Sequence, residues 1–383
     1  MKDYNKLSLE MHEKLKGKLE IKSKKEIKSK DDLSIAYTPG VAEPCREIYK
    51  NPEDVYKYTI KGNTVAVISD GSAVLGLGNI GPEAAIPVME GKAILFKEFA
   101  NIDAFPICLK NQNVNQTIET IKNISPIFGG INLEDFKAPE CFEIEQALQN
   151  LGIPVMHDDQ HGTSVVVLAG IINSLKVVKK EIENVKIVVN GSGAAGTAVT
   201  KLMLKYGFKN IIVLDTEGII YKGRKNLNKI KEEIASITNH NLLQGDLTEA
   251  MKRTDIFIGL SKPDLLTADM IKSMNDKPII FALSNPTPEI MPDIAEESGA
   301  YIFATGRSDF PNQVNNVLAF PGIFRGALDI KAKRITDEMK LAAAETLASI
   351  IKHPTREEIL PYSLDKSIVP KIAEAVKMAY REI

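Results

Sequence analysis

A strand, a glycine-rich loop and a helix follow one another between positions 186 and 207, and this order constrains the fold more than any other feature. The strand KIVVN runs into GSGAAG, and TAVTKLMLKYG continues with helical periodicity. Glycines at this spacing permit a tight turn, close approach of the backbone to a pyrophosphate and close helix-on-strand packing, and the helix start offers free N–H groups to the anion. The unit predicts a Rossmann-type dinucleotide-binding domain. Its predicted cofactor-binding residues are Gly191, Ser192, Gly193, Ala194, Ala195 and Gly196.

Asp215 ends the next strand, IIVLD, and bears on which nicotinamide cofactor is bound. A carboxylate here accepts hydrogen bonds from the adenosine ribose and disfavours a 2′-phosphate. Lys222, Arg224 and Lys225 follow closely and carry the charge that a 2′-phosphate would need. The residues therefore favour NAD and keep NADP as the alternative. A glycine-rich helix entry with no ligand is the alternative to cofactor binding.

Strands alternate with helices in both halves of the chain, which is typical of parallel α/β sheets. The strand candidates before position 161 are TVAVISD, AFPICL, IFGGINL and IPVM, and those after it are IVVN, IIVLD, DIFIGL, PIIFALS and YIFATG. We expect an N-terminal open parallel α/β domain with a helical N-terminus over residues 1–161. We expect a Rossmann-type domain with C-terminal helices over residues 162–383, and a site in the cleft between the two.

Charge and cysteine content exclude several classes of partner. The chain has 48 Lys and Arg against 50 Asp and Glu, without the basic excess that nucleic-acid binding requires. Its cysteines, Cys45, Cys108 and Cys141, form no disulfide framework, which favours the reducing cytoplasm. The longest apolar run, SVVVLAGII, is shorter than the about 20 residues that span a bilayer. We therefore expect a cytoplasmic protein that binds a small molecule and neither membrane nor nucleic acid.

Acidic pairs follow two successive strands in the first half of the chain. Glu134 and Asp135 come after IFGGINL, and Asp158 and Asp159 come after IPVM. Parallel strands bring both pairs to one edge of the sheet, where like charges repel unless a cation lies among them. Carboxylates without a Cys or His motif suit Mg²⁺ or Mn²⁺. The alternative is helix capping, by Asp135 before APECF and by Asp159 before a helix beginning near Thr163.

Lys92 and Tyr37 are candidate proton-transfer residues. Lys92 shares a face with Leu95 and Phe96 of a largely apolar helix, so its charge points toward the core. A partly buried lysine has a lowered pKa and can act as a base, although a lysine that reaches to water is commoner. Tyr37 begins YTPGVA, whose Pro-Gly turn holds it at the start of an ordered loop, where a tyrosine is usually just packed.

The order of motifs along the chain resembles that of malic enzymes, specifically the short bacterial form. The resemblance runs nearly end to end and rests on YTPGVA, SDGSAVLGLGNIG, GKAILFK, INLEDFKAPECF, HDDQHGT, GSGAAG, ALSNPT and NNVLAFPG. It implies oxidative decarboxylation of (S)-malate to pyruvate and CO₂, with NAD(P)⁺ and a divalent metal. It also implies a homodimer, to which the N-terminal segment near Tyr37 contributes contacts.

The resemblance assigns roles to individual residues. Lys92 would take the C2 hydroxyl proton as hydride leaves for the nicotinamide, and Tyr37 would protonate C3 after CO₂ departs. Asp158 would tune Lys92 or orient a ligand. The ligands of Mg²⁺ or Mn²⁺ would be Glu134, Asp135 and Asp159.

Asparagines in two further motifs match positions that contact malate or cofactor in the family, namely Asn285 in ALSNPT and Asn316 in NNVLAFPG. The chain has Ala73 where long eukaryotic malic enzymes carry an arginine that binds a substrate carboxylate. Lys92, Asn285, Asn316 or a residue of a second subunit would then bind that carboxylate.

Two other functions are kept as alternatives. Malolactic enzyme converts malate to lactate without net hydride release, but its chains are the long form, so length argues against it. A non-catalytic nucleotide-binding protein is the other alternative. The intact Tyr37, Lys92 and four acidic residues argue against it.

Overall fold

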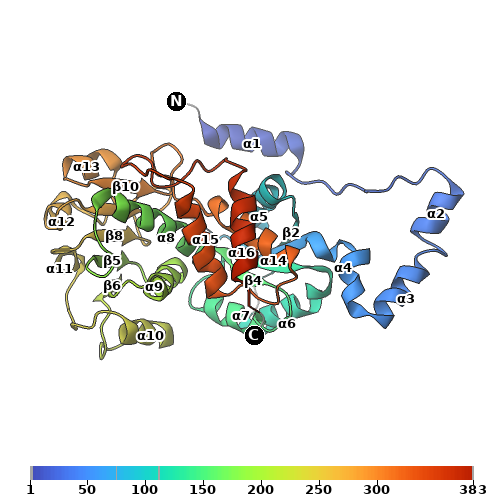
Figure 1. The fold of residues 1–383 in the computed structure, drawn as a ribbon, viewed down its shortest axis with the longest axis horizontal. Helices are drawn as coiled ribbons and strands as arrows, with labels where there is room; N and C mark the ends of the chain where they lie inside the picture. Colours follow the sequence, from blue (N-terminus) through green and yellow to red (C-terminus); the bar gives the residue numbers. More distant parts are fainter. Residues whose placement is uncertain (1–2, 75, 111–112, 382–383) are drawn as a thin grey trace.

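The computed structural model describes residues 3–74, 76–110 and 113–381, and it contains two parallel sheets (Figure 1). The first sheet has the order β2-β1-β3-β4, and all its neighbouring strands run parallel. Its strands are β1 (Thr64–Ser69), β2 (Asp103–Cys108), β3 (Gly130–Leu133) and β4 (Val155–His157).

The second sheet has the order β10-β9-β8-β5-β6-β7, and only the edge strand β7 runs antiparallel. The strand order reverses at β5, which lies between β6 and β8, so a crevice opens at its carboxyl end. The strands are β5 (Lys186–Asn190), β6 (Asn210–Asp215), β7 (Gly218–Ile219), β8 (Ile256–Gly259), β9 (Ile279–Ala282) and β10 (Ile302–Thr305). The predicted two-domain α/β architecture is confirmed.

Helices connect the strands, as the alternating pattern predicts. In the first half these are α5 (Gly81–Ala100), α6 (Val114–Ile124) and α7 (Glu140–Leu148). In the second half they are α9 (Ala194–Tyr206), α10 (Lys229–Ile237), α11 (Leu247–Met251), α12 (Ala268–Lys272) and α13 (Pro292–Glu297). Short 3₁₀ turns occupy Pro52–Asp54, Ile60–Asn63, Ser125–Ile127 and Asn316–Leu318.

Helix α8 (Asp158–Val178) joins the two sheets and begins earlier than predicted. The expected start near Thr163 is wrong because the segment from Asp158 to Thr163 is already helical. The two aspartates in the first turn interact favourably with the helix dipole. Among the described residues, α8 alone is long and apolar enough to cross a membrane. However, 72% of its apolar window is buried, as in the core helix of a folded domain.

The C-terminal helices α14 (Phe320–Asp329), α15 (Asp337–Ser349) and α16 (Ile368–Ala379) return to the first half of the molecule. The ring of Phe96 on α5 lies 4.7 Å from that of Phe320 and 5.3 Å from that of Phe324. Buried apolar residues therefore form one cluster from β1 to α16, so these helices fasten the first sheet to the second.

The N-terminal arm, defined here as residues 3–60, has a different character. It contains α1 (Tyr4–Leu15), α2 (Lys30–Ala36), α3 (Ala42–Lys50) and α4 (Val55–Tyr58). Figure 1 shows α2 and α3 standing out from the two sheets at one end of the molecule. No residue of the arm is buried.

Candidate active site

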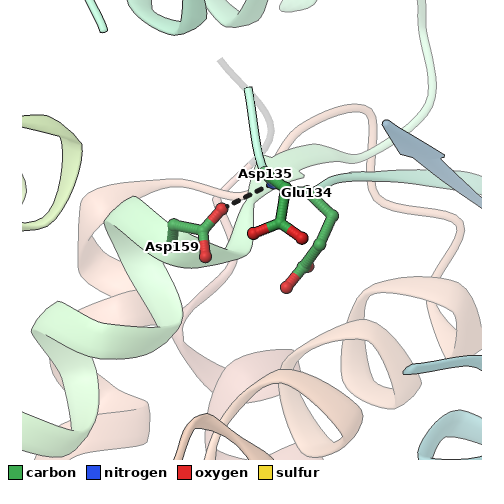
Figure 2. A group of neighbouring side chains, drawn as sticks. All are labelled: Glu134, Asp135 and Asp159. Atoms are coloured by element: carbon green, nitrogen blue, oxygen red, sulfur yellow. Dashed lines mark hydrogen bonds between the residues drawn. The ribbon is translucent and has the colours of Figure 1, made fainter. Parts of the chain in front are cut away.

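Carboxylates from two neighbouring strands meet at one edge of the first sheet. Glu134 and Asp135 directly follow β3, and Asp159 lies in the first turn of α8 after β4. Oxygen atoms of these side chains all lie within 4.8 Å of one another, and Figure 2 shows the carboxylates grouped together. The Asp135 N–H donates a hydrogen bond of 2.8 Å to Asp159 Oδ2 and joins the ends of the two strands.

This group fits a divalent cation better than it fits helix capping. Helix α7 has Pro139 and α8 has His157 at the N-cap, and neither helix has a side-chain cap hydrogen bond. The alternative that Asp135 and Asp159 serve as N-caps is therefore wrong. Three carboxylates that converge at the end of a sheet supply the hard oxygen donors that Mg²⁺ and Mn²⁺ prefer.

Lys92 projects from α5 into the same cluster. Its Nζ lies 2.6 Å from Asp158 Oδ2 and 2.9 Å from Glu134 Oε1, and 4.4 Å from the centre of the Phe320 ring. The side chain is only 11% exposed, so Lys92 does not reach out to bulk water. The structure thus brings together Lys92, Asp158 and the three carboxylates beside it.

The charges of this cluster shift one another's pKa. Burial by itself lowers the pKa of Lys92, but the Asp158 and Glu134 carboxylates outweigh it, so the pKa is raised. The expectation of a lowered pKa for Lys92 is therefore wrong. Burial raises the pKa of both Glu134 and Asp158 despite the nearby Lys92 ammonium, and neighbouring carboxylates add to that rise.

Polar side chains hold this cluster in place. Asn316 Nδ2 donates to Asp158 Oδ2 at 3.1 Å, and Asn316 Oδ1 accepts from Thr163 Oγ1 at 3.2 Å. Asn132 Nδ2 donates to Glu134 Oε2 at 2.9 Å. The sequence interpretation does not single out Asn132 or Thr163. The signal at Asn132 is an amide inside the otherwise apolar buried strand GINL.

The loop after β1 connects the carboxylates to Asn285. The Ala73 N–H donates to the Asp135 carbonyl at 2.9 Å. Gly76 has φ +72°, and a Cβ there would lie 3.0 Å from the Asn285 carbonyl oxygen. Asn285 therefore lies at the edge of the site, although its side-chain Nδ2 donates to the Leu283 carbonyl at 3.3 Å.

The glycine-rich loop lines a cavity of about 790 Å³ at the carboxyl end of β5. Gly191 has φ +126°, and a Cβ there would lie 2.5 Å from the Leu260 carbonyl oxygen. A Cβ at Gly196 would lie 1.8 Å from the Gly191 carbonyl oxygen, whereas one at Gly193 would meet open space. Helix α9 begins at Ala194, directly after the lining residue Gly193, and has no side-chain cap, so no capping side chain occupies its N-terminal N–H groups, which is the usual arrangement for anion binding.

Asp215 borders the same cavity and is engaged by two cations. Arg224 binds both carboxylate oxygens, with Nη1 2.9 Å from Oδ1, and Lys231 Nζ lies 2.6 Å from Oδ2. Burial alone would raise the pKa of Asp215, but these hydrogen bonds lower it to about 2. The sequence interpretation includes Arg224 and omits Lys231. Lys231 lies in the first turn of α10, well after the end of the strand that carries Asp215.

Of the two predicted catalytic residues, Lys92 lies in the carboxylate cluster, whereas Tyr37 lies elsewhere in the described chain. Tyr37 is the C-cap residue of α2 on the N-terminal arm, and Figure 1 shows α2 standing away from the two sheets. The residue is 66% exposed, so the alternative of a merely packed tyrosine is wrong. Within the described chain its hydroxyl makes no hydrogen bond.

Comparison with known protein families identifies the family of this chain. The family models described as "Malic enzyme, N-terminal domain" and "Malic enzyme, NAD binding domain" match residues 16–149 and 160–380. The chain belongs to the malic enzyme family. It is an enzyme of the NAD(P)-dependent, decarboxylating malate dehydrogenase type, as the resemblance of its motifs predicts.

The names of similar malic enzymes include both NAD-dependent and NADP-dependent forms. The NADP-dependent malic enzyme of Halomonas elongata is 46% identical over 97% of this chain and 92% of its own length. The crystal structure of the NAD-dependent malic enzyme of Thermotoga maritima is 51% identical and superposes with a TM-score of 0.94, covering 97% of this chain and 98% of that one.

A third relative contradicts the expectation that malolactic enzymes have long chains. The "Bifunctional malic/malolactic enzyme" of Bacillus subtilis is 53% identical over 98% of this chain and 92% of its own length. A short chain thus carries the malolactic name, and length does not separate the two activities. The malolactic reaction remains the alternative.

Proposed function

We propose that this malic enzyme carries out metal-dependent oxidative decarboxylation of (S)-malate to pyruvate and CO₂, with reduction of NAD(P)⁺. The observation that carries the proposal is Lys92 held between Glu134 and Asp158, beside three converging carboxylates. A base next to a cation site is what removal of a hydroxyl proton and loss of CO₂ require.

Glu134, Asp135 and Asp159 would hold Mg²⁺ or Mn²⁺. When bound, the ion supplies positive charge that stabilises the negative charge on the substrate oxygen as CO₂ departs. Asn132 fixes the orientation of Glu134, and the Asp135 backbone fixes that of Asp159. The ligands are therefore preorganised from both strand ends.

Lys92 and Asp158 would move the hydroxyl proton. Lys92 must be neutral to accept it, and Asp158 Oδ2, only 2.6 Å from Nζ, can take up the proton that Lys92 gives away. Burial raises the pKa of Asp158 and by itself favours that transfer, whereas the attraction of the Lys92 ammonium to Asp158 and Glu134 opposes it and raises the pKa of Lys92. Asn316 holds Asp158 in position through its 3.1 Å hydrogen bond.

The cofactor would lie on the loop from Gly191 to Gly196, with its adenosine ribose near Asp215. We propose NAD as the preferred cofactor because Asp215 ends the strand as a carboxylate. The alternative, NADP, has support from Arg224 and Lys231, the two cations that contact Asp215. Asn285 and Asn316 would contact malate or the nicotinamide.

We further propose that residues 1–161 form the substrate and metal domain and residues 162–383 the nucleotide-binding domain, from which Asn285 and Asn316 would reach the substrate. A cytoplasmic homodimer with malate and pyruvate as its small-molecule partners fits this proposal. Three free cysteines support the reducing compartment.

A product assay tests the proposed function. Purified protein is incubated with (S)-malate and Mn²⁺, using NAD⁺ and NADP⁺ in parallel, and reduced cofactor, pyruvate and lactate are all quantified. Equal amounts of pyruvate and reduced cofactor are expected. Lactate without net reduction would instead establish the malolactic reaction, and no product with either cofactor would leave a non-catalytic nucleotide-binding protein.

A further inference from the structure

Glu289 is a fully buried carboxylate in the segment between β9 and α13. Its Oε1 accepts a hydrogen bond from the Ser261 N–H at 3.3 Å, and its Oε2 accepts one from the Ser284 N–H at 3.1 Å. Ser261 follows the end of β8, and Ser284 follows the end of β9. The two oxygens of one side chain therefore join the carboxyl ends of neighbouring strands.

The backbone encloses this carboxylate. A Cβ at Gly259, the last residue of β8, would collide with the Glu289 carboxyl carbon. In the described part of the chain the carboxylate is hydrogen-bonded by backbone N–H groups and forms no ion pair. Burial raises the pKa of Glu289, and its backbone hydrogen bonds only partly offset that rise. Because burial of a carboxylate without a cation is costly, a side chain that only filled this space would be apolar.

The two joined loops serve different parts of the site. Ser261 borders the nucleotide cavity, and its Oγ accepts from Asn190 Nδ2 at 3.3 Å, at the strand end that leads into the glycine-rich loop. Asn285 directly follows Ser284 and lies beside Gly76, at the edge of the carboxylate site. Glu289 thus links the nucleotide cavity to the asparagine that is expected to contact malate or the nicotinamide.

We infer that Glu289 is a positioning residue, which fixes the nucleotide cavity and Asn285 relative to each other so that cofactor and malate meet in the correct geometry. The inference rests on the proposed function, which places the cofactor on residues 191–196 and Asn285 against malate or the nicotinamide. Glu289 is fully buried, so it acts through the backbone of Ser261 and Ser284 and not by direct contact with a ligand. A displacement of about 1 Å between reacting groups can lower a rate by about 100-fold.

The variant Glu289→Gln tests the inference. Glutamine keeps the size of the side chain, but its NH₂ group would face one of the two backbone N–H donors and break that hydrogen bond. The Kd for reduced cofactor, measured by fluorescence, should rise about tenfold, and kcat should fall about tenfold or more. The Kd for Mn²⁺ should stay within about twofold of wild type, because the carboxylates lie on the other sheet. Unchanged cofactor affinity and kcat in Glu289→Gln would overturn the inference.

Asp255→Asn is the matched control. Asp255 is a buried carboxylate of the same sheet, and its Oδ2 accepts from the Lys186 N–H at 2.8 Å, so it joins the starts of β5 and β8. Both variants should lower Tm, but only Glu289→Gln should raise the Kd for reduced cofactor. An equal rise in both variants would reveal a general loss of stability and overturn the positioning role.

Hydrogen exchange tests the link in the unmodified protein. ADP-ribose, which lacks the nicotinamide, is added without malate, and amide exchange is followed by mass spectrometry. Slower exchange is expected in residues 259–262 and also in residues 283–286, none of which borders the nucleotide cavity. Slowing confined to residues 259–262 would contradict the link through Glu289. If Glu289→Gln loses cofactor affinity but the wild type forms no pyruvate from malate, the proposed function fails and the positioning role stands.

Discussion

Lys92 Nζ lies 2.6 Å from Asp158 Oδ2, and this pair couples α5 of the first sheet to the first turn of α8. The same ammonium contacts Glu134, so the base candidate and a predicted metal ligand share one buried charge network. A change at any of these residues is therefore expected to alter both proton transfer and cation binding.

Removal of Lys92 should abolish turnover and spare cofactor binding. Loss of a general base typically lowers the rate by about 10² to 10⁴-fold, so Lys92→Ala should lower kcat by at least that range. The nucleotide loop lies on the other sheet, so the Kd for reduced cofactor, measured by fluorescence, should stay within about twofold of wild type. Lys97→Ala changes a half-exposed lysine of the same helix and is the control. Persistent turnover in Lys92→Ala would show that another group is the base.

Asn132 should matter for metal binding through its contact with Glu134. Its amide orients Glu134, and loss of such a supporting group typically costs about 10 to 100-fold in metal affinity. Asn132→Ala should weaken Mn²⁺ binding by that factor, as measured by electron paramagnetic resonance of free Mn²⁺. Asn132→Asp, which places another carboxylate beside Glu134, should not restore it. An unchanged Mn²⁺ affinity in a folded Asn132→Ala protein would contradict the assignment of Glu134 as a ligand.

Arg224 should shift the choice between the two cofactors. Arg224→Ala removes the guanidinium from Asp215 and leaves a carboxylate freer to accept hydrogen bonds from the ribose of NAD. The ratio of kcat/KM for NAD⁺ over that for NADP⁺ should rise about tenfold or more, as expected for a lost charge-assisted hydrogen bond. Lys222→Ala, which removes a nearby cation, is the comparison. A ratio that moves toward NADP⁺ would show that Arg224 does not face the 2′ position.

Asp337 should make the fold sensitive to acid. Burial alone would raise its pKa, but Lys340 and Lys205 lower it to about 2, against an ordinary value near 3.8. Because the pKa is lower in the folded state, Asp337 stabilises the fold above its ordinary pKa, and that stability is lost as the pH falls from about 4 toward 2. Thermal melts should therefore show a smaller loss of Tm over this range for Asp337→Asn than for the wild type. Glu345→Gln, at an exposed carboxylate of the same helix α15, is the control. Parallel curves for Asp337→Asn and the wild type would rule out this contribution.

Local patterns predicted the sheet and the nucleotide loop because the relevant physics is local. The order of strand, GSGAAG loop and helix depends on close backbone contacts at Gly191 and Gly196. The two glycines that permit these contacts are visible in the sequence. The meeting of Glu134 with Asp159 followed from the parallel register of β3 and β4, which pairs Leu133 with His157.

Other features depend on contacts that a single sequence does not reveal. The raised pKa of Lys92 comes from carboxylates on other elements, and Lys231 reaches Asp215 only through the placement of α10. The position of Tyr37 outside its own site depends on the course of the whole arm. The start of α8 at Asp158 was missed because the HDDQHGT motif reads as a loop, with polar residues and a glycine.

The most direct test of the central claim is Mn²⁺-dependent product formation by metal-depleted protein, compared between the wild type and Asp159→Asn. The wild type should form pyruvate and reduced nicotinamide in equal amounts only after Mn²⁺ is added, and Asp159→Asn should form neither at the same Mn²⁺ concentration. Asp269→Asn, at a 96% exposed aspartate, should behave like the wild type. Full product formation by the metal-depleted wild type, or wild-type behaviour of Asp159→Asn, would contradict a metal-dependent site at these carboxylates.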